Sequence, residues 1–187
     1  MQINSLIQSC IIGDEGAWEM LVNTYSKRIF NMAFQFSGSY EEAEDLTQEI
    51  FLKLYNTLPK YDFEKNFSAW FLTLAKNHLI DQYRKTKWEK RKRTDFNDYF
   101  LIPSSAFSPE NGILKEESKK LVWQGLNFLS SEIRIAVILR DLQGKSYEEV
   151  AEILDLPLGT VKSRLNRGRL QLAKILKEKK EEREYEM

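Results

Sequence analysis

The side chains best suited to binding chemistry lie in a cationic stretch near the end of the chain. Between Leu158 and Lys180, eight lysines and arginines accompany a single acid, Glu178. On a helical wheel of about 100° per residue, the apolar side chains of this stretch fall on one side and the polar ones lie opposite or on the flanks. The candidate contact residues on the polar side are Lys162, Ser163, Arg164, Asn166, Arg167 and Arg169. Arginine hydrogen-bonds guanine and asparagine hydrogen-bonds adenine in the major groove of DNA, so this face could recognise duplex sequence.

The surrounding residues predict the element that would carry this face, a helix-turn-helix over residues 146–176. Ser146 and Glu149 have the spacing of a capping box, which begins a first helix. Pro157 ends that helix, because proline lacks an amide donor, and it suits the first turn of the next helix. The second helix should pack through Leu158, Val161, Leu165, Gly168, Leu172 and Leu176. A solvated charged face on an ordinary helical hairpin is the alternative, but the cap, the turn and the sequence GTVKSRLNRGR together favour DNA binding.

A second candidate region combines cations with aromatic rings in a helix expected over residues 66–93. Residues 71–93 hold eight lysines and arginines and only two acids, with Tyr83 and Trp88 among them. Rings that stack on bases, beside cations that follow phosphates, suit single-stranded nucleic acid. The polar face of this helix should carry Asn77, Asp81, Arg84 and Lys85. On composition alone, core aromatics beside a charged helix end are an equal alternative.

An acidic patch is expected on a helix over residues 39–58. Ser39 and Glu42 form a further capping box, and apolar residues follow at helical spacing. The core stripe is Ala43, Leu46, Ile50, Leu54 and Leu58. The patch on the other side is Asp45, Gln48 and Glu49.

Two helices should precede the helix of residues 39–58, over residues 3–12 and 17–36. The apolar face of the second carries Trp18, Leu21, Val22, Tyr25, Ile29, Met32, Ala33 and Phe36.

The pattern as a whole predicts an all-α protein of two small helical domains, over residues 1–93 and 113–187. Residues 94–112 contain two prolines and no lysine or arginine, which is typical of an extended linker. The tail EKKEEREYEM should fray.

The formal charge of the chain is zero, with 28 basic and 28 acidic residues, but acidic residues predominate in residues 1–70. A neutral chain with segregated charge suggests several different partners.

Three segments resemble a known family in the expected order. The run RDLQGKSYEEVAEILDLPLGTVKSRLNRGR resembles the C-terminal DNA-binding domain of the extracytoplasmic-function (ECF) sigma factors of bacterial RNA polymerase. The segment EEAEDLTQEIFLKLY resembles the motif by which these factors dock on the clamp helices of the polymerase β′ subunit. The segment FSAWFLTLAKNHLIDQYRK resembles the one that opens the minus-ten promoter element.

The resemblance implies roles for individual residues. Asp45, Gln48 and Glu49 would contact the polymerase, with Leu46 and Phe51 supporting their helix. The loop of residues 60–66 would capture a flipped base. The implied minus-ten set is Lys60, Tyr61, Asn77, Asp81, Arg84, Lys85 and Trp88. At the minus-thirty-five element, the implied base-facing residues are Lys162, Ser163, Asn166 and Arg167. The implied phosphate-binding residues are Arg140, Arg164 and Arg169.

The resemblance implies three partners: core RNA polymerase, through its β′ clamp helices and β flap, promoter DNA and an anti-sigma factor.

The free-energy cost of opening DNA also favours a polymerase partner. Separating about ten base-pair steps costs on the order of 14 kcal/mol at about 1.4 kcal/mol each. Each base stacked on an aromatic ring returns only about 1–3 kcal/mol. A stand-alone helix-turn-helix regulator is the main alternative. An RNA- or single-strand-binding module is a third, but it leaves the C-terminal motif unexplained.

Composition excludes several other kinds of site. Cys10 is the only cysteine and His78 the only histidine, so an intrachain disulfide and a Cys/His zinc site are excluded. Cys10 lies among isoleucines and leucine, which indicates a buried thiol. No nucleophile stands beside a base, so we expect no enzyme activity, cofactor or metal. No run of about 18 apolar residues occurs, and we expect a soluble cytoplasmic protein.

Overall fold

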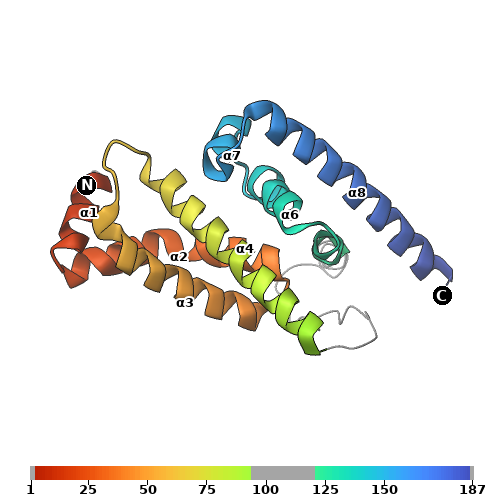
Figure 1. Ribbon diagram of the computed structural model, residues 1–187, viewed down its shortest axis with the longest axis horizontal. Coiled ribbons are helices and arrows are strands. Elements are labelled where there is room, and N and C mark those ends of the chain that lie inside the picture. The colour runs from red at the N-terminus through yellow and green to blue at the C-terminus, as the bar shows by residue number, and fades with distance from the viewer. Residues whose placement is uncertain (1–2, 94–120, 186–187) are drawn as a thin grey trace.

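The computed structural model describes residues 3–93 and 121–185, and the described part is built from helices (Figure 1). The N-terminal unit contains α1 (Ile3–Ile11), α2 (Glu15–Ser37), α3 (Tyr40–Thr57), the short 3₁₀ helix η1 (Leu58–Lys60) and α4 (Phe67–Arg93). The C-terminal unit contains a helical segment over residues 121–127, α6 (Ser131–Val137), the π-helical turn η2 (Ile138–Leu142), α7 (Tyr147–Leu154) and α8 (Leu158–Tyr185). The expected linker, residues 94–112, lies outside the described residues.

Side-chain caps fix where the helices begin. The predicted capping box at the start of α7 is confirmed in both directions, since Ser146 accepts from the Glu149 amide and Glu149 accepts from the Ser146 amide. At the start of α3, Ser39 accepts from the Glu42 amide. The helix α2 ends at Gly38, whose φ of 78° is a left-handed conformation that glycine adopts without strain.

The core of the N-terminal unit follows the predicted apolar periodicity, with one correction. The α3 stripe from Ala43 to Leu58 is buried as expected, and Cys10 is buried too. Aromatic rings fill the space between α2 and α4, where Tyr25 meets Phe67 and Phe71 edge-on at centroid distances of 5.5 Å. Val22 was expected on the apolar face of α2, and this was wrong: its side chain is exposed because neighbouring helices cover only one side of α2.

The C-terminal unit positions α8 by close packing against α6. A methyl group built on Gly168 would lie 2.6 Å from Ile133 and 2.8 Å from Val137, so only glycine permits this approach. Val161 and Leu165 are fully buried on the same face. Leu158 was also expected there, but it is exposed because it stands at the first turn, beyond the covering helices.

The tail was expected to fray, and this was wrong over most of its length, because α8 continues to Tyr185. Ion pairs one turn apart, Lys174–Glu178 at 3.8 Å and Lys177–Glu181 at 3.7 Å, support this part of the helix.

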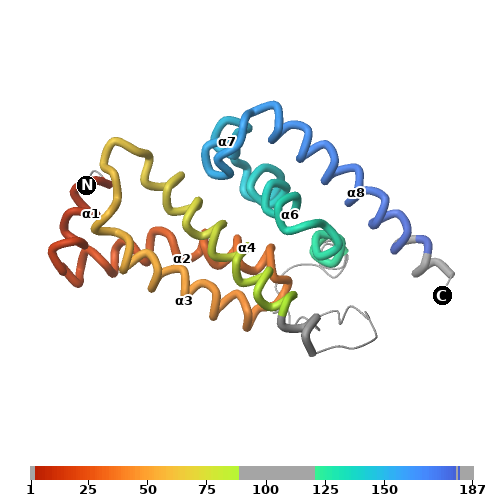
Figure 2. The backbone as a smooth tube through the Cα atoms, in the orientation of Figure 1, coloured from red at the N-terminus to blue at the C-terminus, as the bar shows by residue number. Residues whose placement is uncertain are grey.

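The two units pack against each other along α4. In Figure 2, α4 lies between the α2–α3 layer and the C-terminal helices α6 and α7. The buried residues of both units form one continuous hydrophobic core. In the part of the chain that the structure describes, no helix combines the length and the apolar character needed to cross a bilayer.

Candidate nucleic-acid interface

The exposed face of α8 carries the four expected base-facing residues. These are Lys162, Ser163, Asn166 and Arg167, and all four are exposed. Asp155 adopts a left-handed φ of 53° at the end of α7, which turns the chain sharply into α8. Because the opposite face of α8 is buried on α6, this row of polar side chains is held rigidly toward solvent. The arrangement is the one in which a recognition helix enters a major groove.

Two of the expected phosphate-binding arginines converge on Tyr147 instead. Arg169 pairs with both carboxylate oxygens of Asp141 and donates to the Tyr147 hydroxyl at 3.4 Å. The Arg140 guanidinium lies 4.7 Å from the centre of the Tyr147 ring and donates to the Lys145 carbonyl. The hydrogen bond from Arg169 lowers the pKa of Tyr147, and the hydrogen bond to Asp141 raises the pKa of Arg169. No pattern in the sequence indicates this cluster, because Asp141 and Tyr147 lie outside the helical wheel of α8.

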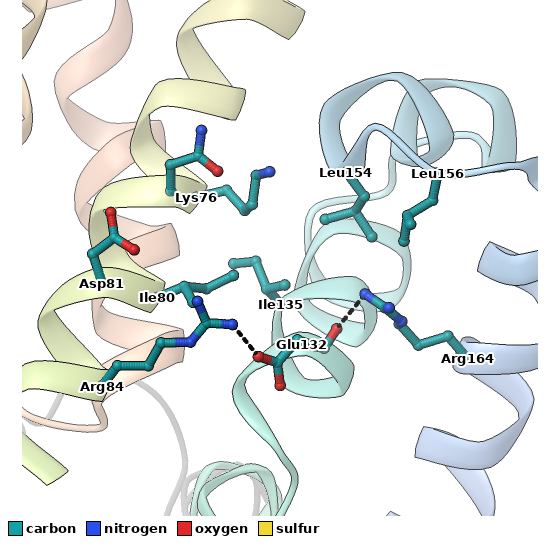
Figure 3. A pocket seen from close by; sticks show the side chains of 10 residues that line it. Lys76, Ile80, Asp81, Arg84, Glu132, Ile135, Leu154, Leu156 and Arg164 are labelled. Atoms are coloured by element: carbon teal, nitrogen blue, oxygen red, sulfur yellow. Dashed lines mark hydrogen bonds and ion pairs between the residues drawn. The ribbon is translucent and has the colours of Figure 1, made fainter. Parts of the chain in front are cut away.

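The expected minus-ten residues of α4 are all exposed: Asn77, Asp81, Arg84, Lys85 and Trp88. Three of them, Asn77, Asp81 and Arg84, also line a crevice of about 220 Å³. The opposite wall of this crevice comes from the C-terminal unit (Figure 3). The residues of that wall are Glu132, Ile135, Leu154, Leu156 and Arg164.

An ion pair crosses this crevice, and a second arginine contacts the same glutamate from its own unit. Arg84 Nη2 lies 2.8 Å from Glu132 Oε1, and Arg164 donates to the Glu132 backbone carbonyl at 3.5 Å (Figure 3). Partial burial is the largest single effect on Glu132 and disfavours its charged form. The hydrogen bond and charge of Arg84, with hydrogen bonds from the Glu132 amide and Ser131, together outweigh it and lower the pKa of the carboxyl group. Lys76 is buried at the same place, and desolvation lowers its pKa, although Asp155 and Asp81 oppose this effect.

The loop before α4 holds its tyrosine inside the protein. Tyr61 is 5% exposed, packs against Trp70 at a centroid distance of 5.0 Å, and donates from its hydroxyl to the Lys65 carbonyl. Burial raises the pKa of this phenol. Lys60 is exposed beside it. The Tyr61 ring therefore shapes the loop in this structure and presents no open face to a base.

The acidic patch on α3 is tied to α4 by residues that sequence reasoning missed. Asp45 and Gln48 are exposed, whereas Glu49 Oε2 lies 2.7 Å from both His78 Nε2 and Gln82 Nε2. His78 and Gln82 stand one turn apart on α4, but nothing in this spacing points to Glu49, which is 29 or more positions away in the sequence. Leu46 is buried, and Phe51 packs edge-on against Phe71 at 5.5 Å, so both support α3 from beneath.

Comparisons with known proteins place both units in one family. Residues 21–89 match the family model "Sigma-70 region 2", and residues 120–172 match "Sigma-70, region 4". The chain is 30% identical over 184 residues to the ECF RNA polymerase sigma factor SigW of Bacillus subtilis, covering 95% of this chain and 98% of the relative. It is 32% identical over 178 residues to the ECF RNA polymerase sigma-E factor of Escherichia coli, covering 88% of each.

Solved structures give the same result. The sigma factor RpoE in complex with the anti-sigma factor NepR, from Bartonella quintana, aligns with a TM-score of 0.64 and 26% identity. The alignment covers 86% of this chain and 96% of RpoE. CnrH, in complex with the cytosolic domain of CnrY, shares the fold with a TM-score of 0.67 and 22% identity, covering 92% of this chain and 95% of CnrH. The two family models, the long sequence matches and the shared fold together establish that this chain belongs to the ECF sigma factors of the sigma-70 family.

Proposed function

We propose that this ECF sigma factor binds core RNA polymerase and directs it to promoters that have a minus-ten and a minus-thirty-five element. The observation that carries the proposal is the rigid, exposed row Lys162, Ser163, Asn166 and Arg167 on a helix whose other face is buried. A regulator acting alone would have no use for the acidic patch on α3 or for the aromatic and basic helix α4. Its action as a polymerase subunit, without catalysis of its own, would take place in the cytoplasm.

In this proposal α8 enters the major groove of the minus-thirty-five element as duplex DNA. The four exposed residues contact base edges, which discriminate sequence. Arg140, Arg164 and Arg169 would contact phosphates, but all three are engaged within the protein in this structure. Their part in binding therefore requires that they exchange an internal partner for a phosphate, whereas the base-facing row is already in place.

The helix α4 would hold the minus-ten element as a single strand. Lys60, Lys85 and Trp88 are exposed and offer charge and a ring to an unstacked strand. Asn77, Asp81 and Arg84 are exposed as well and complete the set, Arg84 by exchanging Glu132 for the strand. Tyr61 would act indirectly, by fixing the shape of the loop that follows η1.

The α3 patch would dock on the β′ clamp helices, and the C-terminal unit on the β flap. Asp45 and Gln48 are the exposed contacts, and Glu49 would be oriented by His78 and Gln82.

Two relatives of the same fold, RpoE and CnrH, were solved with the anti-sigma factor NepR and with the cytosolic domain of CnrY, respectively. We extend this to a proposal that an anti-sigma factor also regulates the present chain.

Mixing the chain with core polymerase tests the proposal. We expect co-elution and run-off transcripts from members of a promoter library. Asp45→Arg should abolish co-elution, since a cation replaces an exposed acid of the docking patch. Asn23→Arg adds a cation at an exposed position of α2 and serves as the control. The absence of transcripts at any promoter, with tight binding of the isolated chain to one operator, would refute the proposal.

A further inference from the structure

One apolar side chain lies within the proposed base-facing row of α8. Leu170 is 65% exposed, which is the highest value among the large apolar side chains that the structure describes in the C-terminal unit. On a wheel of about 100° per residue, Asn166 lies at about −60° and Arg167 at about +40° from Ser163. Leu170 lies at about −20°, between these two residues and on the side of the helix opposite to α6.

The spacing of this row is that of a recognition helix. Four residues of α8 stand at offsets of 0, 3, 4 and 7 positions: Ser163, Asn166, Arg167 and Leu170. The recognition helix of a homeodomain contacts DNA bases from four positions with the same offsets. From Ser163 to Leu170 the helix rises about 10 Å at 1.5 Å per residue, which is about three base-pair steps of 3.4 Å. A helix that holds the first three side chains against base edges would therefore bring the fourth into the same groove.

The packing of α8 keeps Leu170 in solvent. Gly168 lies against α6 with no room for a methyl group, and Leu165 is fully buried on the same face. These contacts fix the rotation of α8 about its own axis, so Leu170 cannot turn into the core. A helical side chain leans toward the N-terminus of its helix, so Leu170 covers the turn before it, which carries Arg167.

The chemistry of leucine fits one feature of a base pair. It has neither a donor nor an acceptor, so it cannot hydrogen-bond a base edge or a phosphate. In the major groove only thymine presents a C5-methyl group, which apolar side chains contact. Arg167 stands one turn before Leu170 and Lys174 one turn after it, and cations on both sides suit DNA better than an apolar protein surface.

We propose that Leu170 packs against the methyl group of a thymine in the minus-thirty-five element, one or two base pairs from the base that Arg167 contacts. The inference rests on the proposed function, and it adds a specificity-determining residue and the base that this residue recognises.

Replacement of thymine by uracil tests this contact, because the two bases differ only in the methyl group. The full chain with core polymerase is titrated, by fluorescence anisotropy, against a promoter from the library in which each upstream thymine is replaced by uracil in turn. One replacement should weaken binding about fourfold, as expected for the loss of one buried methyl-sized group. Leu170→Ala should weaken binding by a similar factor, and the same uracil should then have little further effect.

Two controls isolate the contact. Leu142 is 39% exposed on η2, outside the row, and Leu142→Ala should leave the effect of every uracil unchanged. Uracil in the minus-ten element should affect the wild type and Leu170→Ala equally, because α8 binds the other element in the proposed function. Leu170→Ala should also keep the thermal unfolding midpoint of the wild type, since the side chain is exposed and alanine favours helix.

The outcomes separate the inference from the proposed function. If a promoter is bound specifically but no upstream uracil distinguishes the wild type from Leu170→Ala, the inference is refuted and the proposed function stands. An upstream element without thymine would also refute it. If Leu170→Ala instead lowers the affinity for core polymerase, the leucine contacts protein and the inference is wrong. If no promoter is selected at all, the proposed function fails, and the inference fails with it.

Discussion

The two proposed DNA-binding surfaces differ in accessibility. On α8 the base-facing residues are exposed and held by a buried opposite face. On α4 the corresponding residues Asn77, Asp81 and Arg84 are also exposed, but Arg84 is paired with Glu132 of the C-terminal unit, and Tyr61 of the preceding loop is buried. The surface proposed for duplex DNA is therefore preorganised, whereas two residues of the one proposed for an unpaired strand are engaged within the protein. The difference indicates that strand capture requires Arg84 to exchange its partner, and that recognition by the base-facing row does not.

The largest expected effect is on the exposed surface. Arg167→Ala should cost about 1–3 kcal/mol of binding to a matched duplex and relax specificity, because a bidentate contact to a base is lost. Fluorescence anisotropy with matched and scrambled duplexes, at fixed salt, measures this. Equal losses on both duplexes would refute a base-specific role for Arg167.

The next effect concerns the support beneath that surface. Gly168→Ala should destabilise the C-terminal unit by about 1–2 kcal/mol, since the added methyl group meets Ile133 and Val137 at 2.6 and 2.8 Å. Gly159→Ala is the matched control on the same helix, because nothing lies within 4 Å of its added methyl group. It should be neutral or stabilising by up to about 1 kcal/mol. Chemical denaturation of the two variants compares them, and equal destabilisation would contradict the packing account.

Arg169 sharpens the comparison within α8. Because its guanidinium is paired with Asp141 and Tyr147, Arg169→Ala should lower the unfolding free energy by about 0.5–1 kcal/mol. Discrimination between matched and scrambled duplexes should change little, in contrast to Arg167→Ala. Thermal unfolding and anisotropy on the same protein separate the two effects. A loss of discrimination with unchanged stability would mean that Arg169 recognises bases.

The smallest effect is a pH dependence of stability. The pKa of Glu132 is lowered in the folded protein, where Arg84 and Arg164 face it from α4 and α8, so its contribution to the unfolding free energy is fully present above its ordinary value of 4.5 and is lost as the pH falls through the lowered value. The unfolding free energy should therefore fall more steeply with acid in the wild type than in Glu132→Gln. Identical acid profiles in chemical denaturation would mean that the pair of Glu132 with Arg84 does not contribute to stability.

Much of the local structure was predictable, because it depends on neighbours in sequence. The capping box at Ser146, the α3 stripe and the packing role of Gly168 all follow from spacing of three or four residues. The exposure of Val22 and Leu158 was not predictable, because periodicity defines an apolar face without saying which part of it another helix covers.

The types of residue at the candidate site were predictable from the sequence, but the internal contacts that these residues make were not. The exposed row on α8 follows from the helical wheel alone. The internal pairing of Arg169, the contact of Glu49 with His78 and the burial of Arg134 each depend on residues 28 or more positions away. Sequence spacing carries no information on contacts between residues so far apart in the chain. The burial of Arg134 in particular was not predictable, because charged side chains are almost never fully buried unless they are paired.

The most direct test of the account is a footprint of the promoter with permanganate reactivity measured in parallel. We predict that polymerase with this chain protects two separated blocks at once, and that thymines become reactive only in the downstream block. Without polymerase, α8 should give at most the upstream block, with no reactive thymines. Protection of both blocks by the isolated chain, or reactive thymines without polymerase, would contradict the division between a preorganised duplex surface and a strand surface whose Arg84 and Tyr61 are engaged within the protein.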